Sequence, residues 1–306
     1  MHVLITDSGL GGLSVCAQLI NLLKNYYNSD DAGSHSYDIR ITYLNAVPSN
    51  DNGYNKMSGK EEQIKTFKKI ISNAVRLVSP DKIFVACGTL SVLLNQFKPL
   101  NIKSVKIEGI VGIGLKLLVN SMKKNPKAKA IIMATPTTIK NNTFQKELIK
   151  NGIPDKQIIA QSCPNLANEI SNDSEGSKVG KIIHYWVKKS LQQQQLKTTE
   201  HLILFLGCTH YSYYENKFKL AFKNEGFSKI TLLNPNYDAA EKLKKYILND
   251  KALNSASKKS ILINFLTPYT IPDRENITLN KLLNPISPET SHALINATTI
   301  PELLND

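Results

Sequence analysis

The chain has no run of apolar residues near the roughly 18 that a membrane-spanning helix requires. Its first residues, Met1 to Leu13, also lack the basic start and the long apolar region of a secretory signal peptide. We therefore expect a cytoplasmic protein with no membrane partner.

Patterns typical of disulfide frameworks and of metal sites are absent too. The chain has four cysteines and no C-x-x-C pair, and its six histidines show no H-x-x-x-H spacing. A chain of this size without a secretion signal rarely builds a disulfide framework, and zinc sites usually show such paired spacings. We expect neither disulfides nor a metal.

The glycine-rich segment Asp7–Gly12 is not a nucleotide-binding loop. It lacks the G-K-[ST] ending of a phosphate loop and the G-x-G-x-x-G spacing of a dinucleotide site. The net charge of +13 could indicate a nucleic-acid partner. The lysines are dispersed along the chain in short runs, however, so we interpret them as a solvated surface and expect no nucleic acid.

Apolar segments of strand length alternate with segments of helical spacing. This βαβ rhythm predicts an α/β fold with parallel sheets and helices on both faces. Expected strands are residues 2–6, 39–44, 82–86, 105–107, 130–134, 201–206, 229–233 and 261–266, and expected helices are 13–23, 60–78, 90–97, 113–122 and 143–151. Residues 28–38, 48–60 and 192–200 are expected to be loops, and the polar tail after Pro268 shows no clear pattern.

Two of the expected strands end at a cysteine. The strand 82–86 leads into Cys87-Gly88-Thr89, and the strand 201–206 leads through Gly207 into Cys208-Thr209-His210. Ligands of open parallel sheets bind beyond the carboxyl ends of the strands. The helices that follow would lower the pKa of both thiols and offer N–H groups to an anion.

A matched pair of cysteines suits the racemisation of an amino acid. The α-proton must leave from one face and return on the other, so two groups flanking the carbon work better than one. An ordinary thiol has a pKa near 8.5, so modest tuning makes it an acid or a base at neutral pH. At the end of the first strand, Asp7 could hold the substrate ammonium group or assist Cys87.

The motifs resemble those of the glutamate racemases. Thr6–Val15 is similar to their D-S-G-x-G-G-L-T/S-V start, Leu206–Tyr211 matches their L-G-C-T-H-Y motif, and Ala86–Ser91 resembles their A-C-N-T-A-S motif. Weaker similarities occur at Ala134–Thr138 and at Cys163–Pro164. The resemblance extends from the start of the chain to about residue 246.

This resemblance implies a cofactor-independent isomerase that interconverts L- and D-glutamate and supplies D-glutamate for the peptidoglycan of the cell wall. It implies two pseudo-symmetric α/β domains of flavodoxin-like or Rossmann-like type, in a homodimer, with the active site in the cleft between the domains. Residues 1–98 with 212–306 would form the first domain, and residues 99–211 the second. The catalytic residues would be Cys87 and Cys208 with their partners Asp7 and His210, and the substrate-binding residues would be Ser8, Gly88, Thr89, Thr209 and Tyr54.

The sequence departs from the family at places that hold the substrate. Gly88 stands where the family has an asparagine, whose side chain helps bind the substrate carboxylate. The family segment G-D-T-A-x-x-P-Y-G is replaced by residues 44–48 and an insertion through Asn52, after which Tyr54 is the one remaining match. We expect weak turnover of glutamate and an increase on Gly88→Asn.

Other interpretations stay open at this point. The substrate could be aspartate, or the chain could be a binding protein on a racemase scaffold without activity. A thiol hydrolase would explain one cysteine but not a second, matched one. We expect Cys16 and Cys163 to be structural, because free cysteines are commonly buried.

Overall fold

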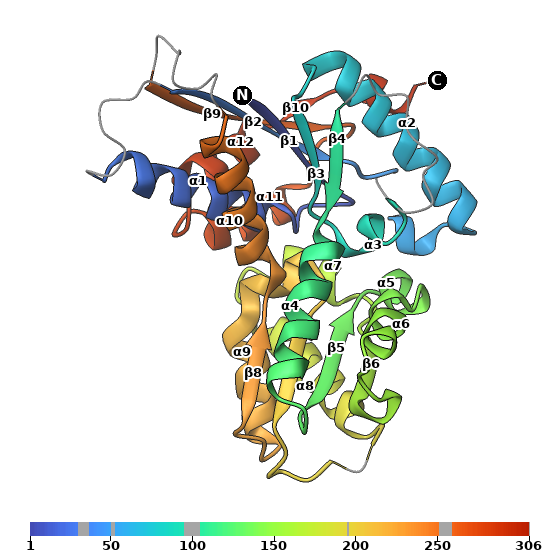
Figure 1. Cartoon of the computed structure of the whole chain (residues 1–306). Helices are drawn as coiled ribbons and strands as arrows, with labels where there is room; N and C mark the ends of the chain where they lie inside the picture. Colours follow the sequence, from blue (N-terminus) through green and yellow to red (C-terminus); the bar gives the residue numbers. More distant parts are fainter. Residues whose placement is uncertain (30–36, 50–52, 95–104, 195, 251–258, 306) are drawn as a thin grey trace.

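The computed structural model describes residues 1–29, 37–49, 53–94, 105–194, 196–250 and 259–305. The chain forms two lobes, each built on its own parallel sheet (Figure 1). The α/β fold expected from the sequence is confirmed. Parts of four expected segments lie outside the described residues, namely the end of helix 90–97, the insertion through Asn52, much of loop 28–38 and residue 195 of loop 192–200.

The larger sheet has the strand order β10-β9-β2-β1-β3-β4 and is parallel throughout. The register places Asp7 beside Asn45, so the last residues of β1 and β2 lie side by side at the carboxyl edge. Its strands are β1 (His2–Asp7), β2 (Tyr37–Asn45), β3 (Lys82–Val85), β4 (Lys106–Gly109), β9 (Lys259–Thr267) and β10 (Thr298–Thr299).

The smaller sheet has the order β6-β5-β7-β8 and is parallel as well. Its central strands β5 (Lys129–Ala134) and β7 (Leu202–Leu206) are flanked by β6 (Ile158–Ser162) and β8 (Ile230–Leu233). The five side chains of β7 are all buried, which agrees with the unbroken apolar run in its sequence and with a strand covered on both faces.

Helices cover both faces of each sheet. In β1 successive side chains point to opposite faces, so Val3 and Ile5 pack with α1 while Leu4 packs with α2. The helices are α1 (Leu13–Tyr27), α2 (Lys60–Val78), α3 (Gly88–Ser91), α4 (Ile110–Lys124), α5 (Pro136–Lys140), α6 (Thr143–Lys150), α7 (Leu166–Asn172), α8 (Ser177–Leu191), α9 (Glu215–Asn224), α10 (Pro235–Leu248), α11 (Asp273–Leu283) and α12 (Pro288–Ile295).

The chain crosses from one lobe to the other at positions that differ from the domain boundaries expected from the sequence. The expected division put residues 106–109 with the second sheet and residues 230–233 with the first. The observed pairing is the opposite: β4 pairs with β3 in the larger sheet, and β8 pairs with β7 in the smaller one. Both strands have four residues and lead directly into a long helix, so nothing in the local pattern marks which sheet they join.

The polar tail after Pro268 is ordered. It contains α11 and α12 and returns to the larger sheet as β10. The Ser287 side chain caps α12 by accepting from the backbone N–H of Thr290, and Leu279, Leu283 and Leu294 are buried against the larger sheet. The tail therefore completes the core of the first lobe.

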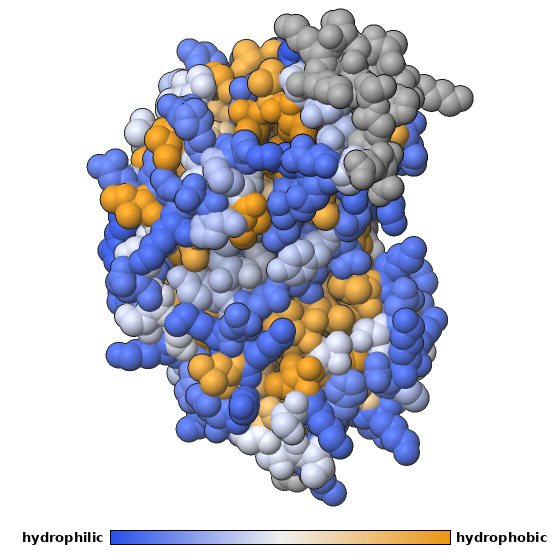
Figure 2. Space-filling view, turned by 90° about the vertical axis from the view of Figure 1, so that its left-hand side faces the viewer, coloured by the Kyte–Doolittle hydropathy of each residue, from blue (hydrophilic) through white to orange (hydrophobic). Residues whose placement is uncertain are grey.

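The face shown in Figure 2 is mainly hydrophilic, with separate apolar patches. Large exposed apolar side chains include Leu220, Tyr237, Ile277 and Ile295. Among the described helices none has the length and apolar character needed to cross a membrane.

Candidate active site

The carboxyl ends of the two sheets meet where the lobes join. Asp7 ends β1, Cys87 follows β3, and Cys208 follows β7 of the other sheet. The Thr209 hydroxyl, next to Cys208, donates a hydrogen bond of 2.8 Å to Asp7 Oδ2. The structure thus brings together the two cysteine loops and the first strand, as the motifs predicted.

Asp7 is connected to both cysteine loops. The Ser8 hydroxyl lies 3.3 Å from Asp7 Oδ1 and 3.1 Å from Cys87 Sγ, while Thr209 binds the other carboxylate oxygen. Burial raises the pKa of Asp7 from 3.8 to about 6, against the opposing effect of the Thr209 hydrogen bond. Its carboxylate can therefore take up and release a proton close to neutral pH.

Both thiols are buried, and this overturns the expectation of a lowered pKa. The Cys87 sulfur accepts the Leu90 N–H at 3.4 Å, but burial and the neighbouring Asp7 charge raise the pKa of Cys87 well above its usual value. Burial likewise raises the pKa of Cys208. Because α3 has only four residues and Cys208 is followed by a 3₁₀ helix, the helix termini are too short to offset desolvation.

Cys208 has a histidine beside it. His210 Nδ1 lies 3.7 Å from Cys208 Sγ, and burial lowers the pKa of His210 to about 4. At neutral pH the imidazole is therefore uncharged, and its lowered pKa makes it a weak base in this arrangement. Each cysteine therefore has its own titratable neighbour, Asp7 for Cys87 and His210 for Cys208.

The loops of the two cysteines touch at their glycines. A Cβ added at Gly88 would lie closer than 3.0 Å to the carbonyl oxygen of Gly207, a distance that real Cβ atoms essentially never show. Glycine at position 88 thus allows the close approach of the two strand ends. In this closed arrangement an asparagine side chain has no room at position 88, so the structure favours a loss of activity in Gly88→Asn over the increase expected from the sequence.

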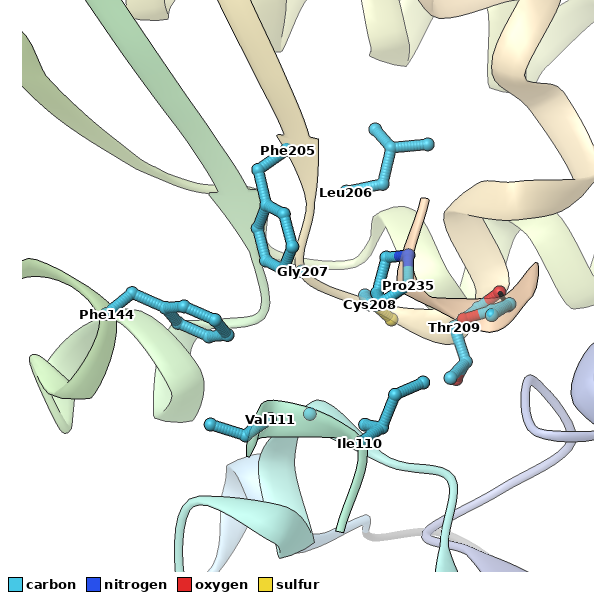
Figure 3. A pocket seen from close by; sticks show the side chains of 11 residues that line it. Ile110, Val111, Phe144, Phe205, Leu206, Gly207, Cys208, Thr209 and Pro235 are labelled. Atoms are coloured by element: carbon cyan, nitrogen blue, oxygen red, sulfur yellow. Dashed lines mark hydrogen bonds between the residues drawn. The ribbon is translucent and has the colours of Figure 1, made fainter. Parts of the chain in front are cut away.

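A small cavity lies between the lobes at Cys208 (Figure 3). Ile110 and Val111 lie across the space from Cys208, and Phe144 and Phe205 close one side. Its volume of about 10 Å³ admits roughly one water molecule. An amino acid does not fit into a cavity of this volume.

The other expected binding residues lie around Cys87. Thr89 is buried and its hydroxyl lies 2.8 Å from that of Thr135, which lies 2.9 Å from that of Thr138. Tyr54 is 1% exposed and packs in the same apolar cluster as Cys87. Its buried hydroxyl has no hydrogen-bond partner among the residues that the structure describes. A polar ligand next to this hydroxyl would supply the missing hydrogen bond.

Sequence reasoning missed Asn236, the second residue of α10. Its side chain is 1% exposed and lines the cavity together with Cys208 and Thr209. The signal was present: an Asn-Pro pair directly after a strand is a typical helix start, and it would have placed residue 236 at a carboxyl edge.

Within the described part of the chain no group of three His, Cys, Asp or Glu side chains could hold a metal ion. The polar groups of the site are instead hydroxyls, one carboxylate, one imidazole, one amide and two thiols.

Comparison with known proteins identifies relatives over most of the chain, although no model of a protein family matches it. The chain is 27% identical over 256 residues to the glutamate racemase of Clostridium botulinum, covering 83% of this chain and 86% of the relative. It is 24% identical over 264 residues to glutamate racemase 1 of Caldanaerobacter subterraneus, covering 86% and 85%.

Solved structures share the fold. Glutamate racemase from Francisella tularensis in complex with D-glutamate superimposes with a TM-score of 0.66 at 18% identity, over 93% of this chain and 92% of that one. Glutamate racemase isoform RacE1 from Bacillus anthracis gives 0.67 at 20% identity, over 92% and 93%. Over most of its length the chain is thus similar in sequence to glutamate racemases, and it shares the two-lobed fold of their solved structures.

Proposed function

We propose that this protein is a cofactor-independent glutamate racemase that uses Cys87 and Cys208 as its two acid/base groups. One observation carries the proposal: Asp7 is hydrogen-bonded to the loop of Cys208 through Thr209 and lies beside Cys87 through Ser8. The two thiols come from different sheets, so they approach a bound α-carbon from opposite sides.

The protonation states follow from the neighbours of each thiol. In one direction Asp7 accepts the proton of Cys87, the Cys87 thiolate removes the α-proton, and the Cys208 thiol protonates the opposite face. In the reverse direction the Cys208 thiolate left by this step, with His210 beside it, removes the α-proton, and the Cys87 thiol protonates the opposite face. A base whose pKa lies near the working pH is the most effective, and the Asp7 pKa of about 6 meets this condition.

The carbanion needs hydrogen-bond donors around the substrate carboxylate. The Gly88 N–H and the hydroxyls near the two cysteines are the available donors in this part of the structure. The residues that we propose as substrate-binding are Ser8, Gly88, Thr89, Thr209 and Tyr54.

The closed cavity has a mechanistic consequence. Closing the lobes over the substrate removes water from the thiols, which strengthens the electrostatic interactions inside the site and prevents loss of the α-proton to solvent. The raised thiol pKa values belong to this closed arrangement without substrate, because burial causes them. A substrate ammonium group near the thiols would favour the thiolate.

The proposal includes the biological setting implied by the family: a cytoplasmic homodimer that supplies D-glutamate for peptidoglycan. Analytical ultracentrifugation of the purified protein tests the dimer.

The decisive experiment follows circular dichroism of the purified protein with single enantiomers of glutamate and aspartate. Loss of optical activity with L- and with D-glutamate supports the proposal. Loss with aspartate alone assigns the other acidic substrate to the same site. No change with either amino acid, together with binding of one of them by calorimetry, identifies a binding protein and refutes the racemase.

A further inference from the structure

Asn236 connects the loop of Cys208 to the first lobe. Its Nδ2 lies 2.6 Å from Ser14 Oγ on α1, 3.1 Å from the Thr209 carbonyl oxygen and 3.0 Å from Ser212 Oγ. Its own backbone N–H donates to the Asn234 side chain at the start of α10. The side chain thus joins α10 and α1 of one lobe to the segment that carries Cys208.

The neighbours determine which end of this amide faces them. The Ser14 hydroxyl donates its hydrogen to the Gly11 carbonyl at 2.8 Å, and the Ser212 hydroxyl donates to the Thr209 carbonyl at 2.8 Å. All three partners of Asn236 therefore present lone pairs, and only an N–H group is favourable there. An oxygen in this place would face three other oxygens.

The hydrogen bonds continue to the catalytic carboxylate. Asn236 holds the carbonyl of Thr209, and the hydroxyl of the same residue donates to Asp7 Oδ2 at 2.8 Å. Gly11 permits this approach, because a Cβ there would lie closer than 3.0 Å to both Thr209 Oγ1 and His210 Nδ1. The position of Thr209 on Asp7 thus depends on how Asn236 seats the loop.

We propose that Asn236 is a positioning residue for the two-thiol site: it seats the Cys208 loop on α1 and thereby aims the Thr209 hydroxyl at Asp7. The proposal rests on the function proposed above. The residue does not exchange protons with the substrate; it acts through Thr209, and it determines where Cys208 stands relative to Cys87.

The titration of the Asp7 carboxyl group tests the proposal without relying on catalysis. His210 follows Thr209 in the same loop, and burial lowers its pKa to about 4, so it is uncharged while Asp7 titrates near 6. The other titratable groups near Asp7 are Cys87, Cys208, Tyr43 and Tyr213. Burial raises the pKa of all four, so they stay neutral while Asp7 titrates. The Thr209 hydrogen bond lowers the Asp7 pKa, and its loss must raise that pKa.

The experiment compares wild type, Asn236→Ala and Asn236→Asp by ¹³C NMR titration of the Asp7 carboxyl carbon, assigned with Asp7→Asn. We expect a higher Asp7 pKa in both Asn236 variants. We also expect a fall in kcat of about tenfold or more in both directions of racemisation, since small misplacements of reacting groups are costly. The acidic limb of the pH profile should move to higher pH, with a smaller change in KM.

The matched control is Ser287→Ala, which removes the side-chain cap of α12 and none of the Asn236 contacts. It should lower the melting temperature while the Asp7 pKa and kcat stay at the wild-type values. If Asn236→Ala does not fold, Ser212→Ala removes one partner and should raise the Asp7 pKa to a smaller extent.

An unchanged Asp7 pKa in the Asn236 variants, or an equal change in Ser287→Ala, overturns the positioning role. A wild-type protein that does not racemise any acidic amino acid refutes the proposed function instead. In that case the NMR titration still decides whether Asn236 controls the contact between Thr209 and Asp7.

Discussion

Replacing Gly88 by alanine should separate the two cysteine loops. The added Cβ would meet the carbonyl oxygen of Gly207, which is backbone and cannot rotate away, with Thr138 Oγ1 at 3.3 Å as its second neighbour. An ordinary van der Waals contact of a Cβ atom begins at 3.4 Å, so the two cysteine loops must move apart by roughly 1 Å. A misplacement of catalytic groups by this distance can lower the rate of racemisation about 100-fold. That loss corresponds to about 2.7 kcal/mol of transition-state stabilisation.

The assay is kcat/KM for L- and D-glutamate, measured by circular dichroism for Gly88→Ala, Gly88→Asn and a control. Gly112→Ala is a suitable control, because a Cβ at this position in α4 meets nothing within 4 Å and alanine favours a helix. We expect full activity in the control and the roughly 100-fold loss in Gly88→Ala, with Gly88→Asn at least as impaired. Activity of Gly88→Ala within about threefold of wild type would show that the loops do not need this close approach during catalysis.

Three further predictions follow from the site. Cys87→Ser and Cys208→Ser should each nearly abolish racemisation, yet each should still exchange the α-proton of one enantiomer in deuterated water; equal loss of exchange for both enantiomers would remove the support for two bases. Asp7→Asn should stabilise the protein against unfolding at about pH 8, by up to about 3 kcal/mol. The reason is that the pKa of Asp7 is about 6 in the folded protein and 3.8 in the unfolded chain. The stability that this carboxyl group contributes is therefore complete below pH 3.8 and is lost as the pH rises through 6. Urea unfolding at about pH 8 and pH 5 measures this difference, and an advantage that does not shrink at the lower pH contradicts it. Activity should survive dialysis against a chelator and should not increase with pyridoxal phosphate; a requirement for either would disprove the two-thiol mechanism.

Local sequence determined most of the elements that position the site. Apolar residues at helical spacing predicted the helix at 60–78, and α2 has these bounds. The unbroken apolar run before Cys208 predicted a buried strand, and all of β7 is buried. These predictions succeed because side-chain periodicity directly reflects which faces of an element are buried.

Local sequence also indicated where the proposed chemistry would take place. A cysteine after each of two strands, with Asp7 after a third, indicated one shared edge, because parallel strands place their carboxyl ends together. In the structure, the hydrogen bond from the Thr209 hydroxyl to Asp7 joins the Cys208 loop to the end of β1.

Contacts between segments far apart in the sequence could not be predicted in this way. β4 joins the larger sheet and β8 joins the smaller one. This choice depends on which neighbouring strand has an unpaired edge, and the four residues of β4 or β8 do not determine it. The raised thiol pKa values arise from burial by surrounding elements, which outweighs the short helices next to each cysteine. The reason for glycine at position 88 is the Gly207 carbonyl, 119 residues away in the sequence and in contact only after both lobes have folded.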